Sequence, residues 1–247
     1  MLKNLAFALS VILSAGFTIL LVADEHEINQ DDPRFVSHTV NLKTQTLRFY
    51  WRNDKGSIYG NFATLRDDLS KRNEELVFAM NGGMFNKDYS PQGLYVENSE
   101  LLSKLDETEE GYGNFYLQPN GVFYINEENL PVICKTTVYQ SARKVKYATQ
   151  SGPLLLIDGK IHPRLINGST NLHIRNGVGV LPDGSLLFAM SKKTINFYDF
   201  ASYFKSKGCK NALYLDGFVS RTYLPSKKWT QMDGNFGVII AETKRKE

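Results

Sequence analysis

The sequence predicts an α+β fold: a single domain on a mixed, largely antiparallel β-sheet with a few covering helices. Short strand-like segments separated by turn residues make up most of the chain, and two segments have helical periodicity. Strands in several hairpins, with a few helices beside them, are typical of this class. No internal repeat, low-complexity linker or break in composition follows residue 24, which favours one domain.

Turn residues divide the strand-like part of the chain. Residues 74–80 (EELVFAM) form a continuous apolar run, which indicates a central strand covered on both faces. Residues 38–51 (HTVNLKTQTLRFYW) alternate in polarity around a turn and are typical of a hairpin. In residues 114–125 (NFYLQPNGVFYI), Pro-Asn-Gly separates two aromatic segments that we expect to be strands. Two further hairpin turns are expected at Asp158-Gly159 and Asp183-Gly184.

Two segments have the pattern of amphipathic helices. In residues 64–72, Leu65 and Leu69 lie four positions apart among charged residues. Residues 196–207 carry one apolar stripe, and Gly208 then provides a helix C-terminus. The stripe consists of Phe197, Phe200, Ala201 and Phe204.

The N-terminus has the pattern of an export segment. Lys3 precedes an apolar run from Leu5 to Val22. Residues 1–23 are therefore either a cleaved signal peptide or, since the run is about long enough to span a bilayer, an uncleaved membrane anchor. Both alternatives place the domain, residues 34–241, outside the cytoplasm, in the periplasm or the extracellular space. This segment is the one predicted contact with a membrane.

Charge and composition narrow the classes of partner. The formal net charge is +3, and Lys244-Arg245-Lys246 in the short basic tail at residues 242–247 supply much of the positive charge, so nucleic-acid binding is not expected. Aromatic residues make up 12% of the chain, which fits a β-rich domain, a carbohydrate-contacting surface or both.

Cysteine and metal chemistry receive limited support. Cys134 and Cys209 could pair in an oxidising compartment or remain as buried thiols, and their spacing does not choose between these. No Cys-x-x-Cys or His-x-x-x-His spacing occurs, and the acidic residues are not clustered, so no metal or cofactor is expected.

Two glycine-containing segments follow or interrupt strands. Asn81-Gly82-Gly83 follows residues 74–80, where two glycines let the backbone turn and expose N–H groups to a ligand. A plain tight turn is the alternative. Gln150-Ser151-Gly152-Pro153 interrupts an apparent long strand and suggests a bulge or a close backbone approach. No Gly-x-Ser-x-Gly elbow surrounds Ser151, so hydrogen bonding is favoured over nucleophilic attack.

Two charged residues also lie beside strands. Arg175 precedes a glycine-rich strand start and has the geometry to bind phosphate through two hydrogen bonds, although a surface role is the commoner one. Asp216 ends the strand NALYLD, and the residues after Asp216-Gly217 do not form a clean returning strand. A catalytic carboxylate at the strand end therefore competes with a turn. The histidines have no triad spacing, which disfavours a Ser-His-Asp hydrolase; they are His26, His38, His162 and His173.

Seven motifs, taken together, resemble the uncovering-enzyme-like phosphodiester glycosidase family in its bacterial, exported branch. In order they are MNGGMF, GLYV, NFYLQPNGVF, ATQSGPLLLIDGKIHP, RNGVGVLPDG, NFYDFASYF and NALYLDG, across about residues 34–241. The resemblance implies hydrolysis of a sugar linked through its anomeric carbon to a phosphodiester. Its motif positions fall on Asn81, Gly82, Gly83, Ser151, Gly152, Pro153, Arg175, Leu215, Asp216 and Gly217. Phe218 and Val219 stand where the family's glycines occur, which implies either a sugar other than N-acetylglucosamine or an altered site.

The chemistry suggests a division of roles. A phosphate monoester is a good leaving group, so one carboxylate, Asp216, can suffice as nucleophile or as base for water, and the site must mainly stabilise the departing charge. Arg175 and the N–H groups of Asn81 to Gly83 or of Ser151 and Gly152 are expected to do this. Ser220 and Gln92 are expected to bind sugar hydroxyls, with Asp88 and Asp199 as reserve acids.

Two alternatives remain for the function. One is a non-catalytic envelope protein that binds glycan or a phosphate polymer, which would not need Asp216. The other is a phosphodiesterase that cuts the P–O bond with a metal ion, which the scattered acidic residues disfavour.

Overall fold

The computed structural model describes residues 32–140, 144–216 and 219–246, and within them the strands form three antiparallel sheets. The first sheet has the order β1 (Phe35–Val40), β12 (Leu186–Ser191), β11 (Asn176–Val180), β13 (Ala212–Asp216), β9 (Leu154–Ile157) and β10 (Lys160–Ile161). The second has the order β15 (Trp229–Thr230), β14 (Thr222–Leu224), β3 (Glu74–Asn81), β16 (Ile239–Arg245) and β2 (Thr46–Tyr50). The third has the order β5 (Glu100–Ser103), β4 (Tyr95–Glu97), β8 (Val145–Ser151), β6 (Gly121–Asn126) and β7 (Pro131–Lys135).

One apolar core joins the three sheets. Each sheet contributes large buried side chains to it, such as Phe188 from the first, Phe78 from the second and Phe123 from the third. Phe188 packs against both other rings, with centroid separations of 5.2 Å to Phe78 and 6.3 Å to Phe123. Because apolar burial is the main favourable term in folding, this shared core ties the sheets into a single domain.

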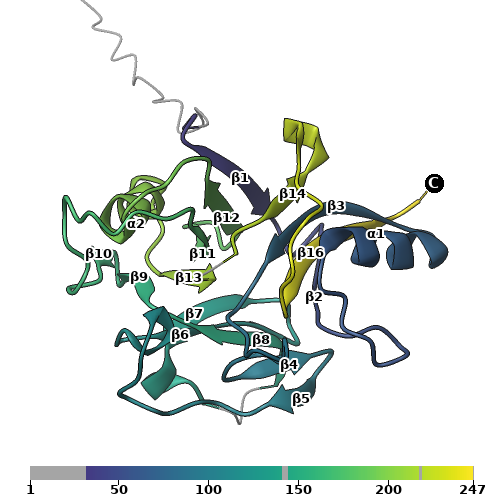
Figure 1. The fold of residues 1–247 in the computed structure, drawn as a ribbon, viewed down its shortest axis with the longest axis horizontal. Coiled ribbons are helices and arrows are strands. Elements are labelled where there is room, and N and C mark those ends of the chain that lie inside the picture. The colour runs from purple at the N-terminus through teal and green to yellow at the C-terminus, as the bar shows by residue number, and fades with distance from the viewer. Residues whose placement is uncertain (1–31, 141–143, 217–218, 247) are drawn as a thin grey trace, which may run out of the picture. The chain divides into compact units, whose positions relative to one another are not determined.

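Two helices cover the outer faces of two sheets (Figure 1). Helix α1 (Phe62–Lys71) packs its buried Leu65 and Leu69 against the second sheet. Helix α2 (Phe197–Ser206) packs its aromatic stripe against the first sheet. The side chains of Asn61 and Asn196 cap the two helix N-termini. Three short 3-10 helices complete the described elements: η1 (Asn114–Tyr116), η2 (Thr136–Val138) and η3 (Pro225–Lys227).

Most expectations about the fold are confirmed. The chain has the α+β class, both helices, a central strand at residues 74–81 and turns at Asp158-Gly159 and Asp183-Gly184. Residues 242–245, expected as part of a basic tail, continue strand β16. In the part of the chain that the structure describes, no helix is long and apolar enough to cross a bilayer.

Three local expectations are wrong. Residues 38–51 are not a hairpin, because β1 pairs with β12 and β2 pairs with β16 in another sheet. The aromatic residues before Pro119 form η1 rather than a strand. The interruption at Gly152-Pro153 is not a bulge within one strand: β8 belongs to the third sheet and β9 to the first, so the chain crosses between sheets there. The alternative expectation of a close backbone approach is confirmed, because a Cβ on Gly152 would lie 2.7 Å from the Phe115 carbonyl oxygen. The first and third errors concern strand partners, which local periodicity does not specify.

The cysteines are not joined in a disulfide bond. Cys209 is buried and packs against α2, whereas Cys134 is half-buried on β7. Burial raises the pKa of the Cys209 thiol to about 12.

We predict that the two thiols react differently with a thiol reagent at about pH 8. The thiolate is the reactive form, and a pKa raised above the working pH keeps Cys209 protonated and slow. Cys134 should be labelled first in the folded protein, and both thiols should be labelled after unfolding without a reductant. Labelling is followed by mass spectrometry of peptides. An unfolded chain that shows no reactive thiol before reduction would contradict the absence of a disulfide bond.

Candidate active site

Three strand ends converge on a cluster of buried polar side chains. Asn81 ends β3, Asp216 ends β13 and Asn176 begins β11. Their exposed fractions are 0%, 2% and 0%. Carboxylate and amide groups are rarely buried to this extent unless they bind one another or a ligand. This arrangement therefore differs from an ordinary core.

The Asn81 side chain connects the cluster. Its Nδ2 donates to Asp216 Oδ2 and to the carbonyl of Val219. Its Oδ1 accepts from Asn176 Nδ2 at 2.9 Å and from the backbone N–H of Arg221 at 2.8 Å. Two donors fix the oxygen end of the amide, so the nitrogen end must point toward Asp216. The amide thus orients the carboxylate.

A β-bulge gives Asp216 its position. Asn176 pairs with Asp216 and Gly177 pairs with Tyr214, so the register skips Leu215. The Leu215 carbonyl instead accepts hydrogen bonds from Gly83 N and from Ser151 Oγ, each at 3.0 Å. A bulge re-aims the side chain that follows it. Here it also draws the ends of β3 and β8 to the end of β13.

Arg175 lies beside this cluster and is fully buried, with 0% exposed. Its guanidinium donates from Nε to the Ile195 carbonyl at 2.8 Å and from Nη2 to the carbonyl and side-chain oxygens of Asn171 at 2.9 and 2.8 Å. It also stacks on Phe197, with 3.5 Å between Cζ and the ring centroid. Burial lowers the pKa of Arg175, and the nearby Tyr214 opposes this. An arginine nevertheless keeps its charge at neutral pH.

Three buried polar atoms around Asp216 have no hydrogen-bonding partner among the described residues. They are Arg175 Nη1, Asn176 Oδ1 and Tyr214 Oη. Tyr214 interacts electrostatically with the guanidinium, but the Oη and Nη1 atoms do not meet hydrogen-bond geometry. Burial raises the pKa of Tyr214, so its phenol stays protonated. A group of unpaired donors and acceptors at one place is typical of a ligand site.

The glycine N–H groups do not have the role expected from sequence. The N–H of Gly82 donates to the Val238 carbonyl and that of Gly83 to the Leu215 carbonyl, each at 3.0 Å. Asn81 lies in the ladder between β3 and β16, and Ser151 in the ladder between β8 and β6. The N–H groups of Gly82 and Gly83 thus hold strands together, so the expectation that these two glycines expose N–H groups to phosphate is wrong.

The remaining expected residues lie at different distances from Asp216. Ser220 Oγ donates to the Ile174 carbonyl at 3.1 Å, just before Arg175. Gln92 Nε2 donates to Tyr116 Oη at 3.4 Å, and no hydrogen bond joins Gln92 to Asn81 or Asp216 in the described structure. Gly152 lies at the crossing between sheets. Val219 is half-buried, while Gly217 and Phe218 lie outside the described residues.

The reserve acids lie apart from the cluster. Asp88 is exposed, and its hydrogen bonds from Ser90 lower the pKa of its carboxyl. Asp199 lies in the first turn of α2, where it accepts from the capping Asn196 at 2.9 Å. Among the described residues, no group of three or more His, Cys, Asp or Glu side chains could hold a metal ion.

Sequence reasoning missed Asn176. An amide that opens an otherwise apolar and glycine-rich strand, directly after Arg175, was the available signal. The bulge at Leu215 had no local signal, because it depends on how β13 pairs with β11.

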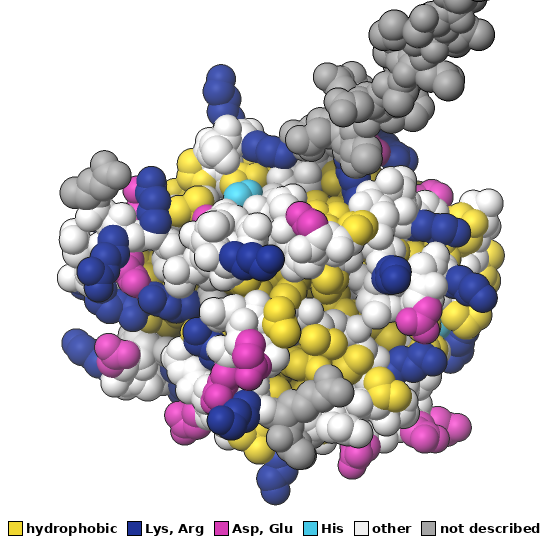
Figure 2. Space-filling view, turned by 180° about the vertical axis from the view of Figure 1, so that it is seen from behind, with side chains coloured by type: hydrophobic (Ala, Val, Ile, Leu, Met, Phe, Trp, Pro, Cys, Tyr) yellow, Lys and Arg dark blue, Asp and Glu magenta, His cyan; other side chains and the backbone are white. Residues whose placement is uncertain are grey.

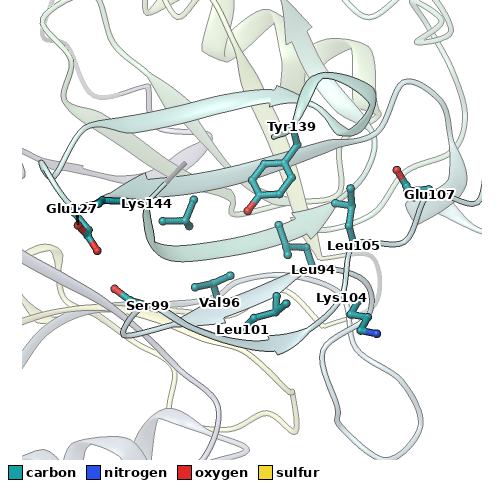
Figure 3. A pocket seen from close by; sticks show the side chains of 11 residues that line it. Leu94, Val96, Ser99, Leu101, Lys104, Leu105, Glu107, Glu127, Tyr139 and Lys144 are labelled. Carbon is teal, nitrogen blue, oxygen red and sulfur yellow. Dashed lines mark ion pairs between the residues drawn. The ribbon is translucent and has the colours of Figure 1, made fainter. Parts of the chain in front are cut away.

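An apolar pocket lies on another face of the protein (Figure 3). Its volume is about 540 Å³, and Leu94, Leu105 and Tyr139 project into it. The ion pair between Lys144 and Glu127, 3.6 Å long, lies at one end. Figure 2 shows hydrophobic side chains gathered in the lower part of the molecule, where the third sheet lies. Ala148 packs with Leu94 and Val96, which line the pocket, whereas the neighbouring Thr149 faces Gly83. Because successive side chains of a strand point to opposite faces, the pocket and the Asp216 cluster lie on opposite faces of β8.

Comparison with known proteins identifies the family. Residues 74–240 match the phosphodiester glycosidase family. The chain is also 34% identical over 205 residues to the protein YigE of Escherichia coli K12, covering 83% of this chain and 80% of YigE. The chain belongs to the phosphodiester glycosidase family.

Solved structures share this family's fold. The catalytic domain of zebrafish N-acetylglucosamine-1-phosphodiester α-N-acetylglucosaminidase, auto-inhibited by its pro-peptide, is similar with a TM-score of 0.57 and 13% identity, over 87% of this chain and 85% of that one. A Burkholderia pseudomallei K96243 protein whose name describes it as exported has a TM-score of 0.53 and 9% identity, over 84% of this chain and 73% of that one. At these identities the likeness concerns the fold, so function must be argued from the site.

We predict that Gly83→Ala destabilises the protein more than Gly159→Ala. Both glycines have positive φ, 103° and 78°, so alanine adds backbone strain in both variants. A Cβ on Gly83 would lie 2.2 Å from Thr149 Oγ1, whereas a Cβ on Gly159 meets nothing within 4 Å. The added crowding should lower the free energy of unfolding by about 1–3 kcal/mol beyond the control, measured by chemical denaturation. Equal losses in the two variants would show that Gly83 is not held against Thr149.

Proposed function

We propose that the protein is an exported hydrolase that cleaves the anomeric bond of a sugar-1-phosphodiester, releasing free sugar and a phosphomonoester. Membership of the phosphodiester glycosidase family supports the class of reaction. The observation that carries the proposal is the orientation of Asp216 by the Asn81 amide, in a buried cluster beside an arginine. Export is supported by the charge and apolar pattern of residues 1–23 and by the similar protein described as exported.

The reaction requires a carboxylate that activates water or attacks the anomeric carbon, and a cation that stabilises the departing phosphate. Water adds its oxygen to the anomeric carbon, the carbon–oxygen bond to phosphate breaks, and the phosphate leaves with the electron pair. Asp216 either takes the proton from water or attacks the carbon first and is then released by water. Since the phosphate is already a good leaving group, a second carboxylate as general acid is not needed.

Arg175 is suited to stabilise the negative charge of the departing phosphate. All the hydrogen bonds described for its guanidinium go to neutral oxygens of Ile195 and Asn171, so its positive charge is not neutralised by an acidic hydrogen-bond partner. An uncompensated buried charge favours an anion nearby, and the unpaired Nη1 is a donor for it. The Nε and Nη2 atoms are held by Ile195 and Asn171, so Nη1 is a preorganised donor.

Two other functions use parts of the same observations. A non-catalytic protein that binds glycan or phosphate polymer would keep Arg175 but would not need an oriented carboxylate. A phosphodiesterase would release sugar phosphate and an alcohol instead of free sugar. Product analysis on a set of anomeric phosphodiesters therefore separates all three functions.

We predict that Asp216→Asn abolishes hydrolysis of the sugar-1-phosphodiester that the wild type cleaves best. The amide is a poor nucleophile and base, so kcat should fall by about 10³-fold or more. Asp158→Asn at the exposed β9–β10 turn is the control, since Asn tolerates the positive φ of 49° there. Equal rates for wild type and Asp216→Asn would remove the carboxylate from the mechanism.

We predict that Arg175→Lys loses about 2–4 kcal/mol of transition-state stabilisation, as when one preorganised donor is removed. Lysine keeps the charge but not the planar arrangement of donors, so kcat/KM should fall while a cation remains. The thermal unfolding midpoint is measured alongside, because Arg175 also connects the segments at Asn171 and Ile195. A destabilised variant with unchanged kcat/KM would show a purely structural arginine.

A further inference from the structure

A separate pocket of about 550 Å³ lies where the second and third sheets meet. One wall is the β1–β2 turn and the start of β2, which contribute residues 42–48. The other wall comes from the third sheet and its turns, through Asn98, Ile125, Asn129, Lys146 and Tyr147. A volume of this size accommodates a small ligand or part of a longer one.

The lining carries positive charge and no negative charge. Lys43, Arg48 and Lys146 line the pocket, and none of its lining residues is acidic. Glu74 lies outside the lining and pairs with Arg48 at 2.7 Å, which compensates one of the three charges. Glu242, also outside the lining, accepts a hydrogen bond from Gln45 at 2.8 Å and contacts His38. Among the described residues, Lys43 and Lys146 have no ion pair, so these two lysines set the sign of the potential within the lining. An anion is the ligand that this potential favours.

Part of the lining is held in place. Lys146 Nζ donates to Asn129 Oδ1 at 3.4 Å and lies 5.8 Å from the centroid of the Tyr147 ring. The Tyr147 hydroxyl donates to Asn98 Oδ1 at 2.7 Å. Lys146 is half-buried, whereas Lys43 is exposed at the pocket edge. Amide, hydroxyl and aromatic groups beside two cations are suited to a sugar ring that carries phosphate.

The pocket and the Asp216 cluster lie toward opposite ends of the second sheet. Tyr50 pairs with Ile239, which also pairs with Asn81 in the cluster. Thr46, at the pocket, lies four residues farther along β2 from Tyr50. At about 3.4 Å per residue, the two places are separated by roughly 14 Å along the strand direction.

We propose that this pocket binds a second phosphate group of an extended substrate, a polymer of sugar units joined by phosphodiesters. The proposal rests on the function proposed above and names its substrate class. A single sugar-1-phosphodiester bound at Asp216 does not extend to the pocket, whereas a chain of several units carries further phosphates at increasing distances. The pocket contributes affinity for the polymer and leaves the chemical step to Asp216.

Direct binding tests the pocket without requiring turnover. Inorganic tripolyphosphate is titrated by calorimetry into the wild type, Asp216→Asn, Lys43→Glu/Lys146→Glu and the control Lys160→Glu/Lys210→Glu. The control makes the same charge change at exposed positions outside the pocket. We expect binding to weaken by about tenfold or more only in the pocket variant, and to weaken with added salt for the others.

A second double variant, Lys43→Met/Lys146→Met, removes both positive charges without adding negative ones and keeps much of the apolar volume of the side chains. It therefore separates the loss of attraction to phosphate from the repulsion that glutamate adds. Circular dichroism checks that each variant is folded. Unchanged affinity in both pocket variants, or no binding by the wild type, would overturn the proposal.

Kinetics then test the substrate class. On a glycosyl phosphate polymer, the pocket variant should show a raised KM with an unchanged kcat, and on a single-unit phosphodiester it should match the wild type. If the wild type cleaves neither substrate, the proposed function fails, while the calorimetry still decides whether the pocket binds phosphate. If a DNA duplex binds through the same lysines more tightly than the polymer, the glycan assignment is wrong.

Discussion

The Asn81 side chain is the interaction on which the candidate site depends. Its single amide links the end of β3 to Asp216 on β13, to Asn176 on β11 and to the backbone at Val219 and Arg221. Removing it would leave several buried polar groups without partners, each at a cost of about 1–3 kcal/mol. Such a connection holds the carboxylate in one orientation, which is what a catalytic group requires and what a turn residue does not.

The architecture makes this connection possible. Three sheets share one core, and their ends meet where β3, β8, β11 and β13 come together. The bulge at Leu215 turns its carbonyl toward Gly83 and Ser151 and brings Asp216 to Asn81. Backbone groups that sequence reasoning assigned to ligand binding are therefore used to assemble the site. In the proposed function, Arg175 supplies the positive charge for the phosphate instead.

Arg175 combines a structural role with the role in phosphate binding that we propose for it. It joins the segments at Asn171 and Ile195, and its buried charge has no carboxylate among its hydrogen-bonding partners. A buried guanidinium in this state costs free energy, which the stacking on Phe197 and the hydrogen bonds to carbonyls offset only in part. A bound anion would supply the missing compensation, which is why we propose that Arg175 binds the phosphate of the substrate.

The sequence by itself determined the fold class, the helices and central strand, and the segments that carry the site. It did so because amphipathic periodicity, glycine turns and the ordered family motifs are local properties of the chain. Only the tertiary structure decided the strand partners, as the failed hairpin at residues 38–51 shows. It also decided that the Gly82 and Gly83 N–H groups are occupied, that Asn176 orients Asn81, and that Lys43 and Lys146 share a pocket. These facts depend on pairing between segments far apart in the chain, and such pairing follows from packing of the whole core rather than from any one segment.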